Sequence, residues 1–103
     1  MKTKYKVRYL PTHEQDVAAV MRYIKYKIQN TAAAERLFDD MNQAVAGRLY
    51  SPLSYKPYFS KNERKIPYYR IRVRNYVIYY VVIDDVVELR RFVYNRRNIG
   101  DIV

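Results

Sequence analysis

The chain contains no cysteine, one histidine, two glycines and four prolines. Without cysteine there can be no disulfide scaffold and no thiolate metal site, and one histidine among scattered carboxylates argues against a zinc site built by the protein. We therefore expect no metal and no cofactor. With so few glycines and prolines, flexible linkers are not expected. The 103 residues should form a single domain, residues 1–103.

Long apolar segments are also missing. The N-terminus lacks the apolar core of a secretion signal, and no apolar run approaches the roughly 20 residues needed to cross a bilayer. A cytoplasmic protein without a membrane partner is the expectation. Half of the residues are apolar and 29% are charged, which is typical of a globular protein.

Acidic residues are few. Twenty basic residues face ten acidic ones, which gives a net charge of +10. Half of the basic residues, ten of them, fall in residues 61–103 together with five acidic ones. This excess favours association with nucleic acid or another acidic partner. The alternative is a basic surface that serves solubility only.

The first half of the chain predicts one strand and two helices. Residues 4–10 alternate between apolar and basic side chains, which predicts a strand. Thr12 and Gln15 form a capping-box pattern for a first helix, whose apolar residues recur at helical spacing as far as Ile28. Asn30 and Thr31 can cap a second helix. The two helices should form an antiparallel hairpin. The expected buried residues of the second helix are Ala34, Leu37, Phe38, Met41, Val45 and Leu49.

The second half predicts a long loop and three strands. Residues 50–67 lose all periodicity and form a loop, and strands follow at about 68–74, 76–83 and 86–94. Tight turns at 74–75 and 84–85 join these strands. The order is β-α-α-β-β-β. It predicts an α+β domain in which a helical hairpin packs on one face of an antiparallel sheet.

The strand at 68–74 carries arginines at alternate positions. Tyr69, Ile71 and Val73 fall on one face. Arg70, Arg72 and Arg74 fall on the other face. Because a half-buried strand cannot slip by one residue without exposing the core, this arginine row is held in one direction. Such a row suits a polyanion.

Several segments together match the pattern of a known superfamily. They are Asp16-Val17, Tyr23-Ile24, residues 33–37, Leu49 and Pro52, followed by residues 69–73, 76–80 and 88–97. In this order and spacing they resemble the RelE/ParE superfamily, the toxins of bacterial type II toxin–antitoxin pairs. The resemblance implies a growth-inhibiting toxin that forms a hetero-oligomer with a cognate acidic antitoxin. RelE-like members cleave mRNA on the ribosome, whereas ParE-like members poison DNA gyrase.

For the RelE-like activity, the resemblance implies a metal-independent endoribonuclease, an mRNA interferase that uses attack by the 2′-hydroxyl. Such a site needs cations for the phosphate and groups that transfer protons. By position, the resemblance assigns catalytic roles to Arg72, Tyr94 and Arg97. For RNA or phosphate binding, the resemblance implies Arg70. From their charge and position we add Lys61, Arg64, Lys65, Arg74, Arg91 and Arg96.

The residues for proton transfer depart from the RelE-like pattern. Arg72 stands where those enzymes carry a lysine, and an arginine pKa above about 12 makes a poor base. Val77 replaces an arginine of the central strand, and the C-terminal tyrosine is missing near Val103. These departures favour the ParE-like branch, whereas the arginine row favours RNA cleavage. A third alternative is a module that binds RNA or protein without catalysis, with tyrosines such as Tyr68, Tyr69 and Tyr79 stacking on bases.

Three other features have simpler explanations. His13 is expected to be an exposed turn residue, and Asp39-Asp40 a solvated helical face. Arg90 and Arg91 straddle the two faces of the last strand, so one of them should point toward the concave or partner-facing side of the sheet. The alternative is a rim ion pair with Glu88 or Asp101. The loop 50–67 could close over the basic face.

Overall fold

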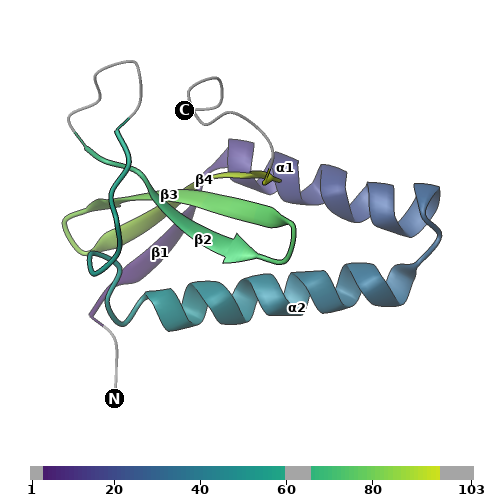
Figure 1. Ribbon diagram of the computed structural model, residues 1–103, viewed down its shortest axis with the longest axis horizontal. Coiled ribbons are helices and arrows are strands. Elements are labelled where there is room, and N and C mark those ends of the chain that lie inside the picture. Colours follow the sequence, from purple (N-terminus) through teal and green to yellow (C-terminus); the bar gives the residue numbers. More distant parts are fainter. Residues whose placement is uncertain (1–3, 60–65, 96–103) are drawn as a thin grey trace.

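The computed structural model describes residues 4–59 and 66–95 of the chain (Figure 1). The order of elements agrees with the prediction of an α+β domain, β-α-α-β-β-β, with a π-helical turn after the first helix. The elements are β1 (Lys6–Tyr9), α1 (Pro11–Arg22), η1 (Tyr23–Lys27), α2 (Thr31–Arg48), β2 (Tyr69–Val73), β3 (Tyr76–Ile83) and β4 (Val86–Tyr94).

The four strands form one sheet in the order β1-β4-β3-β2. Strands β2, β3 and β4 are antiparallel, as expected, and both tight turns are present, with φ of 56° at Arg74 and at Asp84. The sheet is mixed rather than wholly antiparallel, because β1 runs parallel to β4. The reason lies in the connection: the helical hairpin carries the chain away from β1, and a long crossover of this kind permits parallel pairing.

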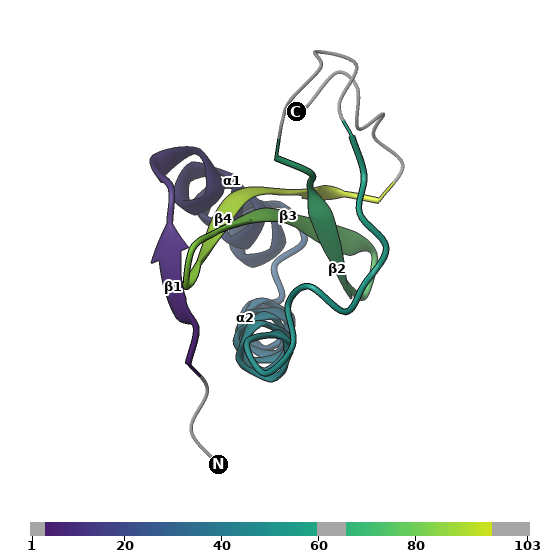
Figure 2. The ribbon, with the colours of Figure 1, turned by 90° about the vertical axis from the view of Figure 1, so that its left-hand side faces the viewer.

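Both helices cover one face of the sheet. Figure 2 shows the sheet arching over α2, and side chains of α1 and α2 share a single core with the strands. This agrees with the expected hairpin on one face. The core between the helices and the sheet consists of Val17, Leu37, Met41 and Val45 with Tyr69, Ile71, Val73, Ile78, Tyr80, Val87, Leu89 and Phe92. A second buried cluster lies on the other face of the sheet and consists of Tyr68, Val77, Tyr79, Val81 and Val93.

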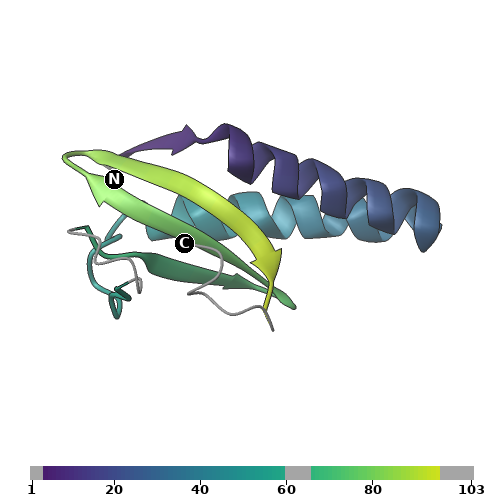
Figure 3. The ribbon, with the colours of Figure 1, turned by 90° about the horizontal axis from the view of Figure 1, so that it is seen from above.

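The hairpin turn projects beyond the strands (Figure 3). Ile28, at this tip, is exposed because no strand lies opposite it. Asn30 caps α2 as expected, since its Oδ1 accepts the N–H of Ala33 at 3.0 Å. Phe38 was expected in the buried stripe, but 44% of it is exposed. It follows Leu37 by one residue and is therefore turned about 100° away from the sheet.

Helix α1 covers the part of β4 that β1 leaves open. β1 pairs only with residues 86–89 of β4. Beyond them, Thr12 Oγ1 donates to the carbonyl of Arg90 at 2.8 Å, and the N–H of Phe92 donates to the Asp16 carboxylate at 3.0 Å. Side chains of α1 thus satisfy an edge that would otherwise be unpaired. The expected capping box is wrong, because α1 begins at Pro11 and its N-cap, Leu10, makes no side-chain cap.

Among the described residues, no helix is long and apolar enough to cross a membrane.

Candidate nucleic-acid interface

Strand β2 presents arginines on the face away from the helices. Tyr69, Ile71 and Val73 are buried against the helices, and Arg70 and Arg72 between them are exposed on the opposite face, as the alternation predicted. Arg74, the third arginine of the expected row, does not lie beside them.

Arg74 lies in the turn after β2, where its positive φ breaks the alternation of the strand. Its Nη2 lies 2.7 Å from Asp40 Oδ2 on α2, and its Nε donates to the same oxygen at 2.7 Å. Asp40 thus directs this guanidinium toward α2, and the prediction that Arg74 stands in line with Arg70 and Arg72 is wrong. Asp39, beside Asp40, is exposed as expected.

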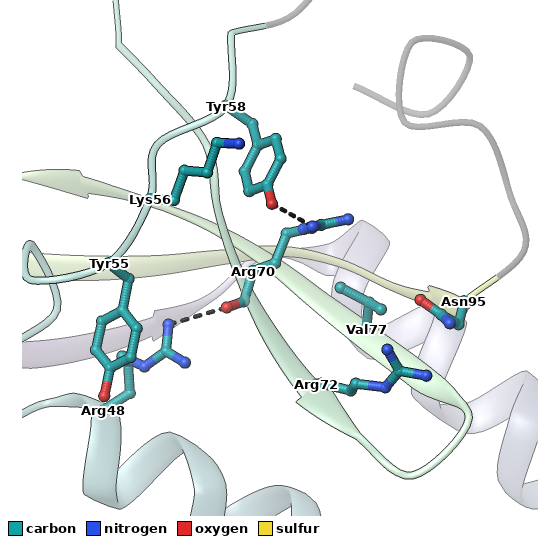
Figure 4. A pocket seen from close by; sticks show the side chains of 8 residues that line it. All are labelled: Arg48, Tyr55, Lys56, Tyr58, Arg70, Arg72, Val77 and Asn95. Carbon is teal, nitrogen blue, oxygen red and sulfur yellow. Dashed lines mark hydrogen bonds between the residues drawn. The ribbon is translucent and has the colours of Figure 1, made fainter.

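Arg70 and Arg72 lie in an open groove of about 290 Å³ (Figure 4). Of the described residues that line it, four are cationic and none is acidic. Side chains of one sign in a concave site raise the local potential for an anion. The lining residues come from the end of α2, from the segment before β2, from β2 and β3, and from the position after β4, and they are Arg48, Tyr55, Lys56, Tyr58, Arg70, Arg72, Val77 and Asn95.

Tyr58 holds one side of the groove. Its backbone pairs with that of Tyr68 through two hydrogen bonds of 2.7 Å, which fix this segment beside the start of β2. Nη2 of Arg70 donates to the Tyr58 hydroxyl, and the Arg70 guanidinium lies 4.0 Å from the centre of the Tyr58 ring. The ammonium of Lys56 lies 5.8 Å from the same ring. A cation, an aromatic face and a second cation are therefore stacked at this end of the groove.

Arg48 holds the other side. Its Nη1 donates to the carbonyl of Arg70 at 2.9 Å and to the hydroxyl of Tyr80 at 3.0 Å. The Tyr80 hydroxyl in turn donates to the carbonyl of Pro52 at 2.7 Å. Burial raises the pKa of Tyr80, so this hydroxyl keeps its proton at neutral pH.

The sequence did not indicate Arg48, Tyr55, Lys56, Tyr58 or Asn95 as parts of a site. Arg48 ends a helix, Asn95 follows a strand, and the others belong to a loop, so no periodicity relates them to β2. The only available signal was the loop itself, because long loops in compact domains are frequently functional.

Tyr94 lies on the other face of the sheet. It pairs with Tyr76, and the two rings are 5.7 Å apart, edge to face. Tyr76 stacks on Phe92 in the core that the helices cover. Arg72 lies on the opposite face of the sheet, beside Val77. The structure therefore does not bring together Tyr94 and Arg72, two residues that were expected to share a catalytic centre.

Arg90 and Arg91 are both held in ion pairs. A bulge in β4 sets Leu89 opposite Tyr80 and Arg91 opposite Tyr79, which leaves Arg90 as the extra residue. Arg90 Nη2 lies 2.8 Å from Glu88 Oε1, which agrees with the alternative of a rim ion pair. Asp16 accepts two hydrogen bonds from Arg91, of 2.7 and 3.1 Å, and these raise the pKa of the guanidinium. This charge is already compensated, which weakens the assignment of Arg91 to phosphate binding.

Five of the expected site residues lie outside the residues that the structure describes, 4–59 and 66–95. The same holds for the part of the loop that was expected to close over the basic face. Within the described ranges, no group of three or more His, Asp or Glu side chains could hold a metal ion. The five residues are Lys61, Arg64, Lys65, Arg96 and Arg97.

His13 is not the exposed turn residue that was expected. It lies in the first turn of α1 and is only 1% exposed. Its ring lies 6.3 Å from that of Phe92, and within the part of the chain that the structure describes its Nδ1 has no hydrogen-bond partner. Burial lowers its pKa. His13 therefore belongs to the packing of α1 against β4.

Comparison with known families agrees with this arrangement. Residues 7–99 match a family model described as the ParE toxin of the type II toxin–antitoxin system, parDE. The match spans β1 to β4, all the elements that form the groove. No curated protein sequence matches the chain.

Proposed function

This chain belongs to the ParE toxin family of type II toxin–antitoxin systems, and we propose that it stops growth by cutting mRNA in the groove of Arg48, Lys56, Arg70 and Arg72. Membership of the family makes it the toxin of a type II module with a cognate antitoxin. The RelE/ParE superfamily that the sequence resembles includes more than one mode of action, so the choice among them rests on the groove.

The observation that carries the proposal is the composition of this groove. Four cations and two tyrosines converge on the face of the sheet that the helices leave open. The cations suit the phosphates of a nucleic acid, and the tyrosine rings of Tyr55 and Tyr58 offer faces on which unpaired bases stack. A single strand presents both features at once.

The groove also offers groups for proton transfer that β2 lacks. Cleavage by the 2′-hydroxyl needs a base for that hydroxyl and an acid for the departing 5′-oxygen. Arg72 cannot act as the base, because its guanidinium stays protonated. Lys56 and Tyr58 lie beside Arg70 and carry groups that exchange protons. In this proposal they take the acid and base roles, while Arg70 and Arg72 stabilise the charge that develops on the phosphate.

The test is inducible expression in bacteria, with the ends of cellular mRNA mapped by primer extension. The proposal expects new mRNA ends that are in phase with codons. Lys56→Met and Arg72→Ala should abolish the cuts and the growth arrest, whereas Lys25→Met, at the projecting hairpin tip, should behave as wild type. Tyr94→Phe should also keep the cuts, because Tyr94 lies across the sheet. Intact mRNA in growth-arrested cells would contradict the proposal.

A second candidate is poisoning of DNA gyrase, the ParE-like mode. The separation of Arg72 from Tyr94 favours it, because such a toxin needs no centre for proton transfer on the basic face. DNA breaks trapped on gyrase, together with intact mRNA, would support this candidate. A groove that binds nucleic acid without catalysis would instead give toxicity in proportion to affinity, with neither kind of cut.

A further inference from the structure

Arg48 is the most constrained cation of the groove. It ends α2, and both hydrogens of its Nη1 have acceptors, the carbonyl of Arg70 and the hydroxyl of Tyr80. The Tyr55 ring covers the guanidinium at 3.5 Å from its centre. The three contacts come from β2, β3 and the segment after α2, so the guanidinium is fixed against three separate parts of the chain.

The anchor of this arrangement is Tyr80. Its side chain is 0% exposed, and its ring stacks on that of Tyr69 at 5.4 Å. Its hydroxyl accepts from Arg48 and donates to the carbonyl of Pro52. A buried ring therefore fixes the position of a cation at the surface, although Tyr80 is itself out of reach of any ligand.

The opposite edge of the guanidinium remains available. Among the described residues, neither Nε nor Nη2 of Arg48 has an acceptor, and the side chain lines the groove. These two groups form the edge that binds a phosphate in bidentate fashion. Because the side chain is already ordered, binding there costs little side-chain entropy.

We propose that Arg48 is a preorganised ligand for one backbone phosphate of a nucleic acid in the groove, and that Tyr80 is the residue that positions it. This deepens the proposed function and rests on it for the class of ligand. It does not require that the bound strand be cut.

The test measures binding of a fluorescent 2′-O-methyl RNA oligonucleotide, which cannot be cleaved by its own 2′-oxygen, over a series of salt concentrations. Removal of one phosphate contact from a single strand reduces the slope of log K against log salt by about 0.7. Arg48→Ala should show this reduction. Arg48→Lys keeps the charge but not the bidentate edge, so it should keep most of the slope and lose affinity.

Tyr80→Phe separates positioning from charge. It removes the anchoring hydroxyl but no cation, so affinity should fall about fivefold at every salt concentration while the slope stays unchanged. Tyr69→Phe is the matched control, since its ring packs against Tyr80 without contacting Arg48. This control should bind as wild type. Thermal unfolding establishes that each variant is folded at the temperature of the binding measurement.

Three results would overturn the inference. They are a wild type that does not bind the oligonucleotide, an Arg48→Ala variant with an unchanged slope, and a folded Tyr80→Phe variant with wild-type affinity. If Tyr80→Phe does not fold, Arg48→Lys decides, because wild-type affinity there excludes a bidentate role. Binding that follows the expected pattern without any mRNA cleavage in cells would refute the proposed function and leave this inference standing.

Discussion

Removal of the Asp16 carboxylate should weaken the packing of α1 against β4 and destabilise the fold. Asp16 accepts hydrogen bonds from Nε and Nη2 of Arg91 and from the backbone N–H of Phe92. It therefore satisfies a strand edge and compensates a charge at the same time. In Asp16→Ala, the N–H of Phe92 and the guanidinium of Arg91 both lose their acceptor.

The magnitude follows from burial. The Asp16 side chain is 18% exposed and that of Arg91 29% exposed, so water partly replaces the lost partners. Hydrogen bonds to charged groups contribute about 1.5 to 3 kcal/mol each when well buried, and an exposed ion pair contributes less than about 1 kcal/mol. A total loss of about 2 to 3 kcal/mol is expected for Asp16→Ala, equivalent to roughly 10 to 20 °C in the melting temperature of a domain of this size.

Urea unfolding of the purified protein measures this loss. Asp16→Asn should fall between wild type and Asp16→Ala, since the amide oxygen can still accept the N–H of Phe92. Glu35→Ala, an exposed acid on α2, is the control and should stay within about 0.5 kcal/mol of wild type. A double-mutant cycle with Arg91→Ala isolates the coupling. The reasoning is refuted if Asp16→Ala unfolds within about 0.5 kcal/mol of wild type.

Three further predictions concern other parts of the fold. Burial lowers the pKa of His13 from 6.5, so the unfolded chain binds more protons below about pH 6.5, and stability should decrease as the pH falls from 7 to 5. In His13→Phe, stability should fall less steeply with pH, as thermal unfolding at several pH values can measure. The same pH dependence in the variant and the wild type would contradict this prediction. Glu88 joins β1 to the bulge of β4 through Arg8 and Arg90. In urea unfolding, Glu88→Ala should lower the free energy of unfolding by about 2 kcal/mol. Arg8→Ala should lower it by under about 1 kcal/mol, because the Arg8 side chain is mostly exposed. Equal losses in the two variants would show that Glu88 does not link β1 to the bulge. Asn30→Ala removes the cap of α2 and should cost about 1 kcal/mol, whereas Asn30→Asp should restore it.

The order of the elements could be predicted because each rests on a local pattern. Alternation gives β2 its buried and exposed faces, and the Asn30 cap marks the start of α2. The parallel pairing of β1 with β4 has no local signal, since it joins residues about 80 positions apart. The burial of His13 was missed for a related reason, because it depends on Phe92 of β4.

The site was predicted only in part, and its charges show why. Net charge counts Arg74 and Arg91 with the other cations, but each of them is paired with a carboxylate far away in the sequence. The turn at 74–75 was predicted, but the alternation was carried through residue 74, where the positive φ of the turn already redirects the Arg74 side chain. Which arginines remain available is therefore decided by tertiary contacts.

The charges of the fold divide by task, and some cations are paired with carboxylates that hold the strands together. Arg8 and Arg90 do so with Glu88, which lies opposite Val81 on the face away from the helices. On the side of α1 and α2, the cations hold the architecture together through Asp16 and Asp40, and their fields are largely cancelled at the distance of a ligand. In the groove, the described lining residues include four cations and no carboxylate, so the fields of these cations add. Four phosphate contacts there correspond to a slope of about −3 in log K against log salt for a single strand. A slope of this size allows the groove to bind a single strand at low salt. It is far smaller than the slope expected if all of the net charge of +10 contacted phosphates. Arrangement, rather than the amount of positive charge, therefore makes this groove a candidate for binding.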